Sequence, residues 1–306
     1  SSPPRLCECC RELCARSNAL LPDVIAMTIT VIRDTVVCLD ANNEPLRDII
    51  LWLDKRTVDP NGAMPAKNMM LFKVAGMEPT AKVVYAASVG NWIMRHEPEI
   101  WARTAKYVML PTYLNYKLTG NLIDSASNQI GHIPFDYKNR RWMKPGSLTR
   151  CFCDVPNEKL CDLVPSGTVI GTVTDEVCAL TGIPAGLPLI STGSDKGCET
   201  LGLAVVDSDK ASISLGTTAT IQFSTTEYVE PQQFLPAYPG VLNDHYNPEI
   251  EIYRGLWLLS WFVKEFGTAD AIDAKEKGMA PEALLDERIR DLPAGSDGLL
   301  LQPDWT

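Results

Sequence analysis

The chain has 306 residues, 45% of them apolar and 22% charged, a composition typical of a globular protein large enough for two packed domains. Its net charge of −10, from 28 basic and 38 acidic residues mixed along the chain, argues against nucleic acid or an anionic membrane surface as a partner. The sequence shows neither an apolar run of the roughly 18 residues that span a bilayer nor the apolar segment of a signal peptide, so we expect a cytoplasmic protein with no membrane partner.

Four of the ten cysteines fall in the N-terminal segment CECCRELC. Cys7 and Cys10 have the C-x2-C spacing of a zinc ligand pair, but no second pair and no histidine follow nearby. The segment also has helical periodicity, with Leu6, Cys10, Leu13 and Cys14 on one face. We therefore expect a half-buried helix with reduced cysteines and no metal site.

The first half of the chain predicts strands followed by helices. β-branched residues dominate residues 24–38, and the pattern up to residue 52 predicts a meander with strands near 24–31, 35–39 and 47–52. Helical periodicity then predicts two helices within 81–105, split near Glu97 and Pro98, and a short helix that begins at Pro111 and ends at Gly120. Residues 121–165 are expected to be irregular.

The second half returns to strands. It predicts a β-hairpin over 167–173, a helix capped by Thr174, a strand over 187–191, a short helix that starts near Asp195, a hairpin over 211–223 and an amphipathic helix closed by Gly267. This mixed order indicates an α/β protein of two domains joined around residues 202–210.

Asp195 is the first candidate for catalysis. It follows the predicted strand 187–191 at the start of a short helix, and small neighbours leave room for a ligand: Gly193, Ser194 and Gly197. One interpretation is an N-cap, in which the carboxylate accepts a hydrogen bond from an amide of the first turn. The other is a general base in a cleft between domains, where the carboxylate takes the proton of an attacking hydroxyl. Position alone leaves both open.

The segment Gly216-Thr217-Thr218 closes the predicted hairpin of residues 211–223. A tight turn with glycine exposes backbone amides, and threonine hydroxyls add donors, so the turn can bind a phosphate-sized anion. A plain hairpin turn is the alternative. The sequence contains no Walker A motif and no Gly-x-Gly-x-x-Gly after a strand, which disfavours the ordinary nucleotide-binding folds.

Arg33, Asp34 and Trp52 are candidates for sugar binding. Arg33 and Asp34 interrupt an apolar segment, and neighbours on a strand point to opposite faces. If either charged side chain is buried, it needs a polar partner, and the hydroxyls of a sugar or polyol can form hydrogen bonds with both side chains. Trp52 can stack on the apolar face of a sugar ring. The alternatives are two solvated charges at a turn and a tryptophan in the core.

Taken together, these segments resemble the FGGY family of carbohydrate kinases. The resemblance runs through nearly the whole chain, in the family's order, over five segments: TITVIRDTVVCLD, ILWLDKRT, NYKLTGNLIDSASNQ, VIGTVTDEVCALTGIPAGLPLISTGSDKGCETLG and SLGTTATI. The fourth ends in a match to the family's catalytic Gly-x-x-Asp, and the fifth matches its phosphate-binding hairpin. Each segment is a weak signal alone, and their common order makes the resemblance specific.

The resemblance implies an α/β, actin-like (ribonuclease-H-like) fold with a cleft between two domains, a sugar-binding domain over residues 1–203 and the start of a nucleotide-binding domain over 204–306. It implies ATP and Mg²⁺ as cofactors and a sugar, ketose or polyol as substrate, with a second copy of the chain as a further candidate partner. Asp195 matches the catalytic base. The substrate-binding positions are matched by Arg33, Asp34 and Trp52, and the phosphate hairpin by Gly216, Thr217 and Thr218.

Two departures from the family pattern stand out. The Asp-x-Gly-Thr segment that contacts Mg²⁺ and phosphate and the adenosine-binding Gly-Gly-x-x-x-Ser segment are absent from this sequence, so we expect a fold incomplete at both ends. Lys196 follows the base where glutamine or asparagine is common. Its charge is expected to lower the pKa of Asp195 or to bind an acidic sugar, a solvated helix residue being the alternative. Besides a sugar kinase, a non-catalytic sugar- or nucleotide-binding module and an actin-like ATPase stay open.

Overall fold

The computed structural model describes residues 3–216, 218–232, 235–252 and 255–300. The α-helices in these ranges are α1 (Pro3–Arg16), α2 (Ala66–Val74), α3 (Glu78–Ala87), α4 (Val89–His96), α5 (Pro98–Arg103), α6 (Leu110–Thr119), α7 (Asp175–Thr181), α8 (Asp195–Gly202), α9 (Trp257–Glu265), α10 (Thr268–Glu276) and α11 (Pro281–Ile289). None of these described helices combines the length and the apolar character that crossing a bilayer requires.

The described strands are short and form several small sheets. They are β1 (Met27–Thr28), β2 (Val36–Leu39), β3 (Lys106–Met109), β4 (Ile123–Ser125), β5 (Phe135–Asp136), β6 (Arg141–Trp142), β7 (Asp162–Val164), β8 (Val169–Thr172), β9 (Pro188–Ile190), β10 (Ala211–Leu215), β11 (Ala219–Phe223), β12 (Tyr238–Pro239), β13 (Tyr246–Asn247) and β14 (Glu249–Ile252). Two sheets have three strands, in the orders β1-β9-β8 and β10-β11-β14. The pairs β2-β3, β4-β7, β5-β6 and β12-β13 complete the pattern.

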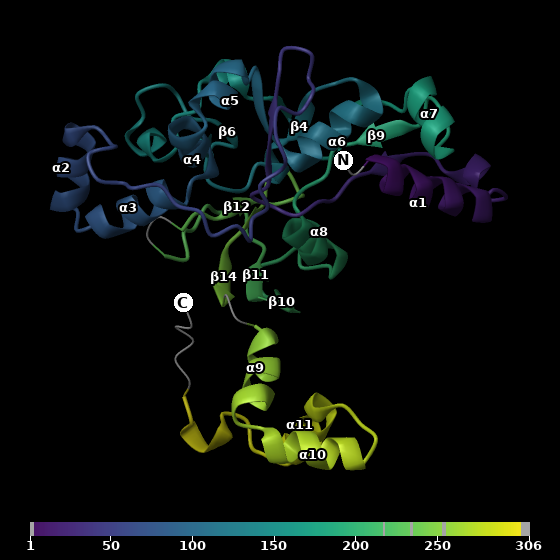
Figure 1. The fold of residues 1–306 in the computed structure, drawn as a ribbon, viewed down its shortest axis with the longest axis vertical. Coiled ribbons are helices and arrows are strands. Elements are labelled where there is room, and N and C mark those ends of the chain that lie inside the picture. Colours follow the sequence, from purple (N-terminus) through teal and green to yellow (C-terminus); the bar gives the residue numbers. More distant parts are fainter. Residues whose placement is uncertain (1–2, 217, 233–234, 253–254, 301–306) are drawn as a thin grey trace.

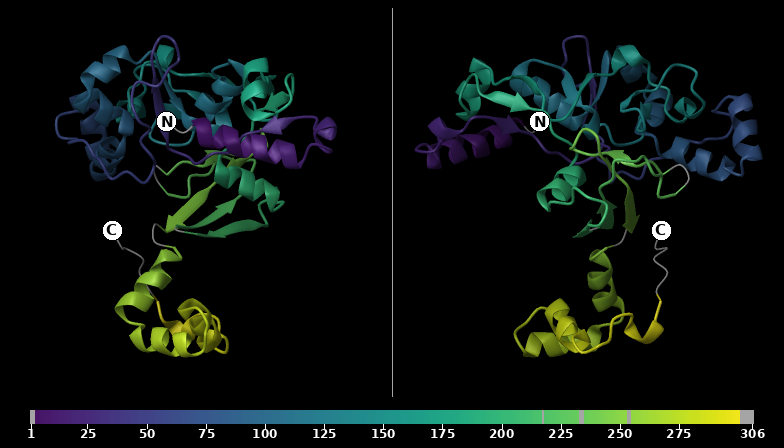
Figure 2. Two further views of the ribbon diagram at one scale, coloured as in Figure 1. Left: turned by 45° about the vertical axis from the view of Figure 1, so that its right-hand side comes forward. Right: turned by 180° about the vertical axis from the view of Figure 1, so that it is seen from behind.

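The structure has a broad part and a narrow part, and the narrow part consists of the sheet β10-β11-β14 and the helices α9, α10 and α11. The broad part extends from α2 and α3 on one side to α1 and α7 on the other, and the sheet β10-β11-β14 lies beneath it next to α8 (Figure 1). Helices α9, α10 and α11 lie beyond that sheet, at the end away from the broad part (Figure 2). The strand β12 lies against the broad part, whereas β14 belongs to the sheet beneath it, so the chain between them links the two parts (Figure 1).

The predicted meander is wrong. The strand β2 exists as expected, but its partner is β3, in antiparallel register from Val36 opposite Met109 to Leu39 opposite Lys106. β1 spans only two residues and pairs in parallel with β9, and the expected strand 47–52 is reduced to a single bridge between Val36 and Ile50. The local pattern located apolar segments correctly but carried no information about partners far along the chain.

Among the predicted helices and hairpins, some are confirmed and others are wrong. The helix α6 ends as predicted at Gly120, whose φ of 78° lies in the left-handed region, and Thr174 caps α7 by accepting a hydrogen bond from the amide of Val177. The hairpin β10-β11 is confirmed. The hairpin over 167–173 is wrong, because β8 pairs with β9 on the far side of α7. The region 81–105 holds α4, α5 and most of α3, and α2 was not predicted.

The N-terminal helix forms, but its buried face differs from the predicted one. Cys10 and Cys14 pack against the cluster of Val173, Ile183 and Leu187 next to α7, whereas Leu6 and Leu13 remain 55% and 65% exposed. The buried face of the helix is therefore the side that carries Cys10 and Cys14.

The main core lies between β2-β3 and the helices α4 and α5. Tyr107 and Phe135 are its largest fully buried side chains, and the ring of Phe135 meets those of Tyr137 and Trp142 edge to face. This packing fixes the segment that follows β4, whose residues 130–138 form one wall of the cavity described next.

Candidate active site

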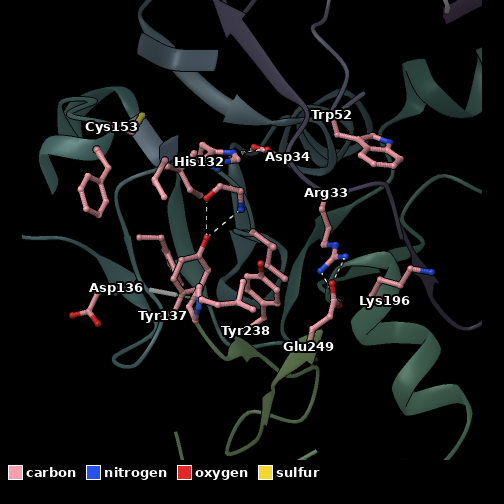
Figure 3. Close-up of a pocket in the computed structure, with 18 of the residues that line it drawn as sticks. Arg33, Asp34, Trp52, His132, Asp136, Tyr137, Cys153, Lys196, Tyr238 and Glu249 are labelled. Carbon is pink, nitrogen blue, oxygen red and sulfur yellow. Dashed lines mark hydrogen bonds and ion pairs between the residues drawn. The ribbon is translucent and has the colours of Figure 1, made fainter. Parts of the chain in front are cut away.

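A cavity of about 580 Å³ lies where the two parts of the structure meet. On one side it is lined by residues from the loop before β2, from 130–138 and from the start of α8. On the other side it is lined by Thr218 and by residues from 228–251. Figure 3 shows that Arg33, Asp34, Trp52 and Lys196 are arranged around this space together with Tyr238 and Glu249. The structure therefore brings six of the predicted site residues to one place: Arg33, Asp34, Trp52, Asp195, Lys196 and Thr218.

Asp195 is the first residue of α8, and Ser194 is its N-cap. The Ser194 hydroxyl accepts a hydrogen bond from the amide of Gly197, which removes the capping explanation for Asp195. The carboxylate of Asp195 is 30% exposed and accepts from the amide of Lys196 at 2.8 Å. A carboxylate at the start of a helix that is not needed as a cap is free to serve a ligand.

The surroundings of Asp195 favour its protonated form. Burial raises the pKa of this carboxyl above its usual range, although the charges of Arg33 and Lys196 and the Lys196 amide lower it. The charge of Lys196 does lower the pKa of Asp195, as expected from the sequence, but burial outweighs this effect and the net shift is upward. A raised pKa makes a carboxylate a stronger base in its ionised form, which suits a group that accepts a proton.

Arg33 lies between two carboxylates from different parts of the chain. Its terminal nitrogens donate to Glu249 of β14 at 2.8 and 3.1 Å, and its Nε lies 3.5 Å from an Oδ of Asp195. The guanidinium also lies over the ring of Tyr238, with Cζ 5.5 Å from the ring centre. Burial works against the charge of Arg33, but Glu249 outweighs it and raises the pKa of the guanidinium.

Asp34 and His132 both line the cavity and contact each other. Its carboxylate accepts from the backbone amide of His132 at 3.0 Å and pairs with the imidazole Nδ1 at 2.7 Å. Asp34 has a φ of 46°, and a Cβ at Gly131 would come within 2.3 Å of its Oδ1, so this approach needs glycine. Nothing in the sequence pattern pointed to His132, which lies 98 positions away along the chain.

The Asp34–His132 pair predicts a specific pH dependence of stability. Burial lowers the pKa of His132, but the bond with Asp34 outweighs it, so the net shift is upward. A raised pKa means that the stabilisation is complete below about pH 6.5, the unfolded value, and is lost as the pH rises through the folded value. In urea unfolding between pH 5 and 9, we expect this loss in the wild type and not in His132→Gln. His96→Gln, at an exposed histidine, is the control and should retain it; a wild-type slope in His132→Gln contradicts the pairing.

Trp52 lines the cavity, in a position where an indole can contact a sugar. Lys196 also borders the cavity, but its ammonium donates to Ser214 at 2.8 Å and to Glu199 at 2.9 Å, and it points away from Arg33 in Figure 3. With these partners, the ammonium of Lys196 is already paired and is poorly placed to attract an acidic sugar.

The turn between β10 and β11 is only partly described. Thr217 lies outside the described residues. Thr218 lines the cavity, while the amide of Gly216 donates to the Thr218 carbonyl at 3.0 Å and so closes the turn itself. A Cβ at Gly255 would lie 2.5 Å from the Thr218 carbonyl carbon, which packs the chain tightly behind the turn. Among the described residues no group of three acidic, histidine or cysteine side chains could hold a metal ion.

The structure is similar to that of xylulose kinase from Rhodospirillum rubrum, with a TM-score of 0.71 and 20% sequence identity over 98% of this chain and 61% of that chain. This similarity defines an α/β protein with the actin-like fold that the sequence predicted. The family model described as the N-terminal domain of the FGGY family of carbohydrate kinases matches residues 4–202, which is more than half of the sequence. The chain therefore belongs to the FGGY family of carbohydrate kinases.

Among the relatives that match most of this chain are two sugar kinases of one organism. The uncharacterized sugar kinase YgcE of Escherichia coli (strain K12) is 26% identical over 301 residues, which cover 98% of this chain and 54% of that protein. Xylulose kinase of the same organism is 28% identical over 254 residues, which cover 82% of this chain and 51% of that protein. The chain thus spans about half the length of the curated relatives it matches.

Proposed function

We propose that the protein is an ATP-dependent carbohydrate kinase that transfers the γ-phosphoryl group of ATP to a hydroxyl of a sugar, ketose or polyol. The observation that supports the proposal most is the position of the Asp195 carboxylate. It does not serve as the N-cap of α8, and it borders a cavity that Arg33 and Thr218 also line. Membership in a family of carbohydrate kinases supports the same reaction. We also propose that residues 1–203 form the sugar-binding domain and that residues 204–306 begin the nucleotide-binding domain.

In this reaction Asp195 accepts the proton of the substrate hydroxyl as its oxygen forms a bond to the γ-phosphorus, and the bond from that phosphorus to the ADP oxygen breaks. Arg33, Asp34 and Trp52 orient the sugar, with donors, acceptors and an apolar surface respectively. The turn of Gly216, Thr217 and Thr218 is proposed to face the phosphates. Mg²⁺ would travel with the nucleotide and neutralise phosphate charge, and because the described residues offer no cluster for it, no step is assigned to it.

Neutral substrates are favoured over acidic sugars. The two cations next to Asp195 are already paired, Arg33 with Glu249 and Lys196 with Glu199. Further carboxylates border the cavity, including Glu251, and they repel a negatively charged substrate. The hydroxyls of a polyol or ketose can donate hydrogen bonds to these carboxylates.

The experiment is to measure ADP release by the full-length gene product with ATP and Mg²⁺ against a panel of polyols, ketoses and sugar acids. We expect one class of neutral sugar to raise the rate well above that with ATP alone, and sugar acids to be inferior. If no sugar stimulates ADP release, while the protein binds sugar, the non-catalytic module is the better description. Sugar-independent ATP turnover would instead favour an actin-like ATPase.

A further inference from the structure

A chain of buried polar contacts surrounds Arg33. Glu249 accepts two hydrogen bonds from the guanidinium and a third from the side-chain amide of Gln222, whose oxygen accepts from Thr200 of α8. Glu249, Gln222 and Thr200 are all buried. Because α8 also carries Asp195, these contacts form a closed path from the helix, through β11 and β14, to Arg33 and back to Asp195. Figure 3 shows the pair of Arg33 and Glu249 within this path.

Two carboxylates compete for the charge of Arg33. Glu249 holds it bidentately at 2.8 and 3.1 Å, with a side chain that is only 4% exposed, whereas Asp195 meets it through Nε at 3.5 Å with 30% exposure. Bidentate pairs between arginine and carboxylate are stronger than single contacts at longer range. Arg33 therefore pairs mainly with Glu249, and Asp195 keeps only the longer contact with Nε of this guanidinium.

Glu249 also determines where the remaining donors of Arg33 point. A guanidinium has five N–H groups in a fixed plane, and Glu249 takes one from each terminal nitrogen. Of the other three, the Nε group is directed toward Asp195, and the plane of the guanidinium is held over the ring of Tyr238. A substrate that lies against Asp195 therefore meets N–H groups that are already oriented.

We propose that Glu249 is a positioning residue for the reaction: by holding Arg33, it keeps that guanidinium from pairing closely with Asp195 and presents its free N–H groups to the sugar. This inference rests on the proposed kinase function. The family model ends at residue 202 and so does not mark Glu249 as part of the site.

The first test replaces Glu249 with glutamine in the full-length gene product and measures the pH profile of kcat/KM with the best substrate of the panel. Arg33 then turns to Asp195, the base is ionised at lower pH and is weaker, so we expect kcat/KM to fall about tenfold or more and its acid limb to move to lower pH. The charged groups that face Asp195 are Arg33, Lys196 and Glu199. Those that face Arg33 are Glu249 and Asp195, beside the titratable but neutral phenol of Tyr238.

The matched control is Glu227→Gln, the same change at an exposed glutamate in the same part of the chain, which should alter neither kcat/KM nor the profile. Glu249→Asp keeps the charge, so it should restore the wild-type acid limb and part of the rate even if Glu249→Gln folds poorly in thermal melts. A fall in kcat/KM with an unmoved acid limb in both variants would mean a structural role only and would overturn the proposal.

A double-mutant cycle tests whether Glu249 acts through Arg33. In the background of Arg33→Gln, adding Glu249→Gln should change kcat/KM by less than about threefold, because its target is already gone. Additive losses would overturn the inference. Failure here is distinguishable from failure of the proposed function: if Asp195→Asn abolishes turnover while the Glu249 variants behave as wild type, the kinase stands and only the positioning role falls.

Discussion

Asp195→Asn is expected to lower the kcat of sugar-dependent ADP release by about 10² to 10⁴, the range that a positioned general base contributes. The asparagine side chain has nearly the same shape as aspartate but cannot accept the proton of the attacking hydroxyl. Because Ser194, and not Asp195, caps α8, the substitution should leave the helix in place. The expected result is thus a loss of rate without a loss of fold.

Two measurements accompany that rate. Sugar binding by calorimetry should be largely unchanged in Asp195→Asn, since the contacts proposed for Arg33, Asp34 and Trp52 remain. Asp209→Asn, the same chemical change at an exposed position before β10, is the matched control and should keep the wild-type rate. Turnover by Asp195→Asn at the wild-type rate would remove Asp195 from the mechanism.

The sequence predicted local features of the site well. The start of α8, the hairpin β10-β11 and the end of α6 at Gly120 depend on residues next to one another, where capping, turn and periodicity patterns apply. The charges and the tryptophan at Arg33, Asp34 and Trp52 suggested sugar binding, the family resemblance agreed with it, and the structure brings all three to one cavity.

What the sequence did not predict depends on contacts between distant segments. Glu249 lies 216 positions from Arg33, and β3 reaches β2 only after four helices have intervened. One signal was available: the alternation in Glu249-Ile250-Glu251-Ile252 places two carboxylates on one face of a strand, where they need a partner or a ligand. The identity of that partner could not be read from any local pattern.

Asp124 is the centre of a buried group of hydrogen bonds that stabilises the structure next to the candidate active site. Its carboxylate is fully buried on β4 and accepts from Thr112 and Asn128 at 2.8 Å each, from the Ser125 amide at 2.8 Å and from Gln129 at 3.2 Å. These contacts tie α6 to the segment that leads into the cavity wall. Each donor would lose its partner in a dry interior if the carboxylate were removed.

Asp124→Ala is therefore expected to lower the free energy of unfolding by about 3 kcal/mol or more at pH 7, because four buried donors are left without an acceptor. Urea unfolding followed by circular dichroism measures this loss. Asp162→Asn, at an exposed position on the paired strand β7, is the control and should change stability by less than about 0.5 kcal/mol. A loss below 1 kcal/mol in Asp124→Ala would show that the donors find other partners.

The charge of Asp124 adds a pH dependence with a definite sign. Burial raises the pKa of this carboxyl to about 6, even though its hydrogen bonds lower it. Because the folded protein binds this proton more tightly than the unfolded chain does, stability should fall as the pH rises from about 4 to about 6 and then level off, by an amount on the order of 2 kcal/mol. Asp124→Asn cannot ionise, so its unfolding free energy should lack this fall. If the variant and the wild type change in parallel over that range, Asp124 is ionised throughout, and its four hydrogen bonds outweigh the cost of burying its charge.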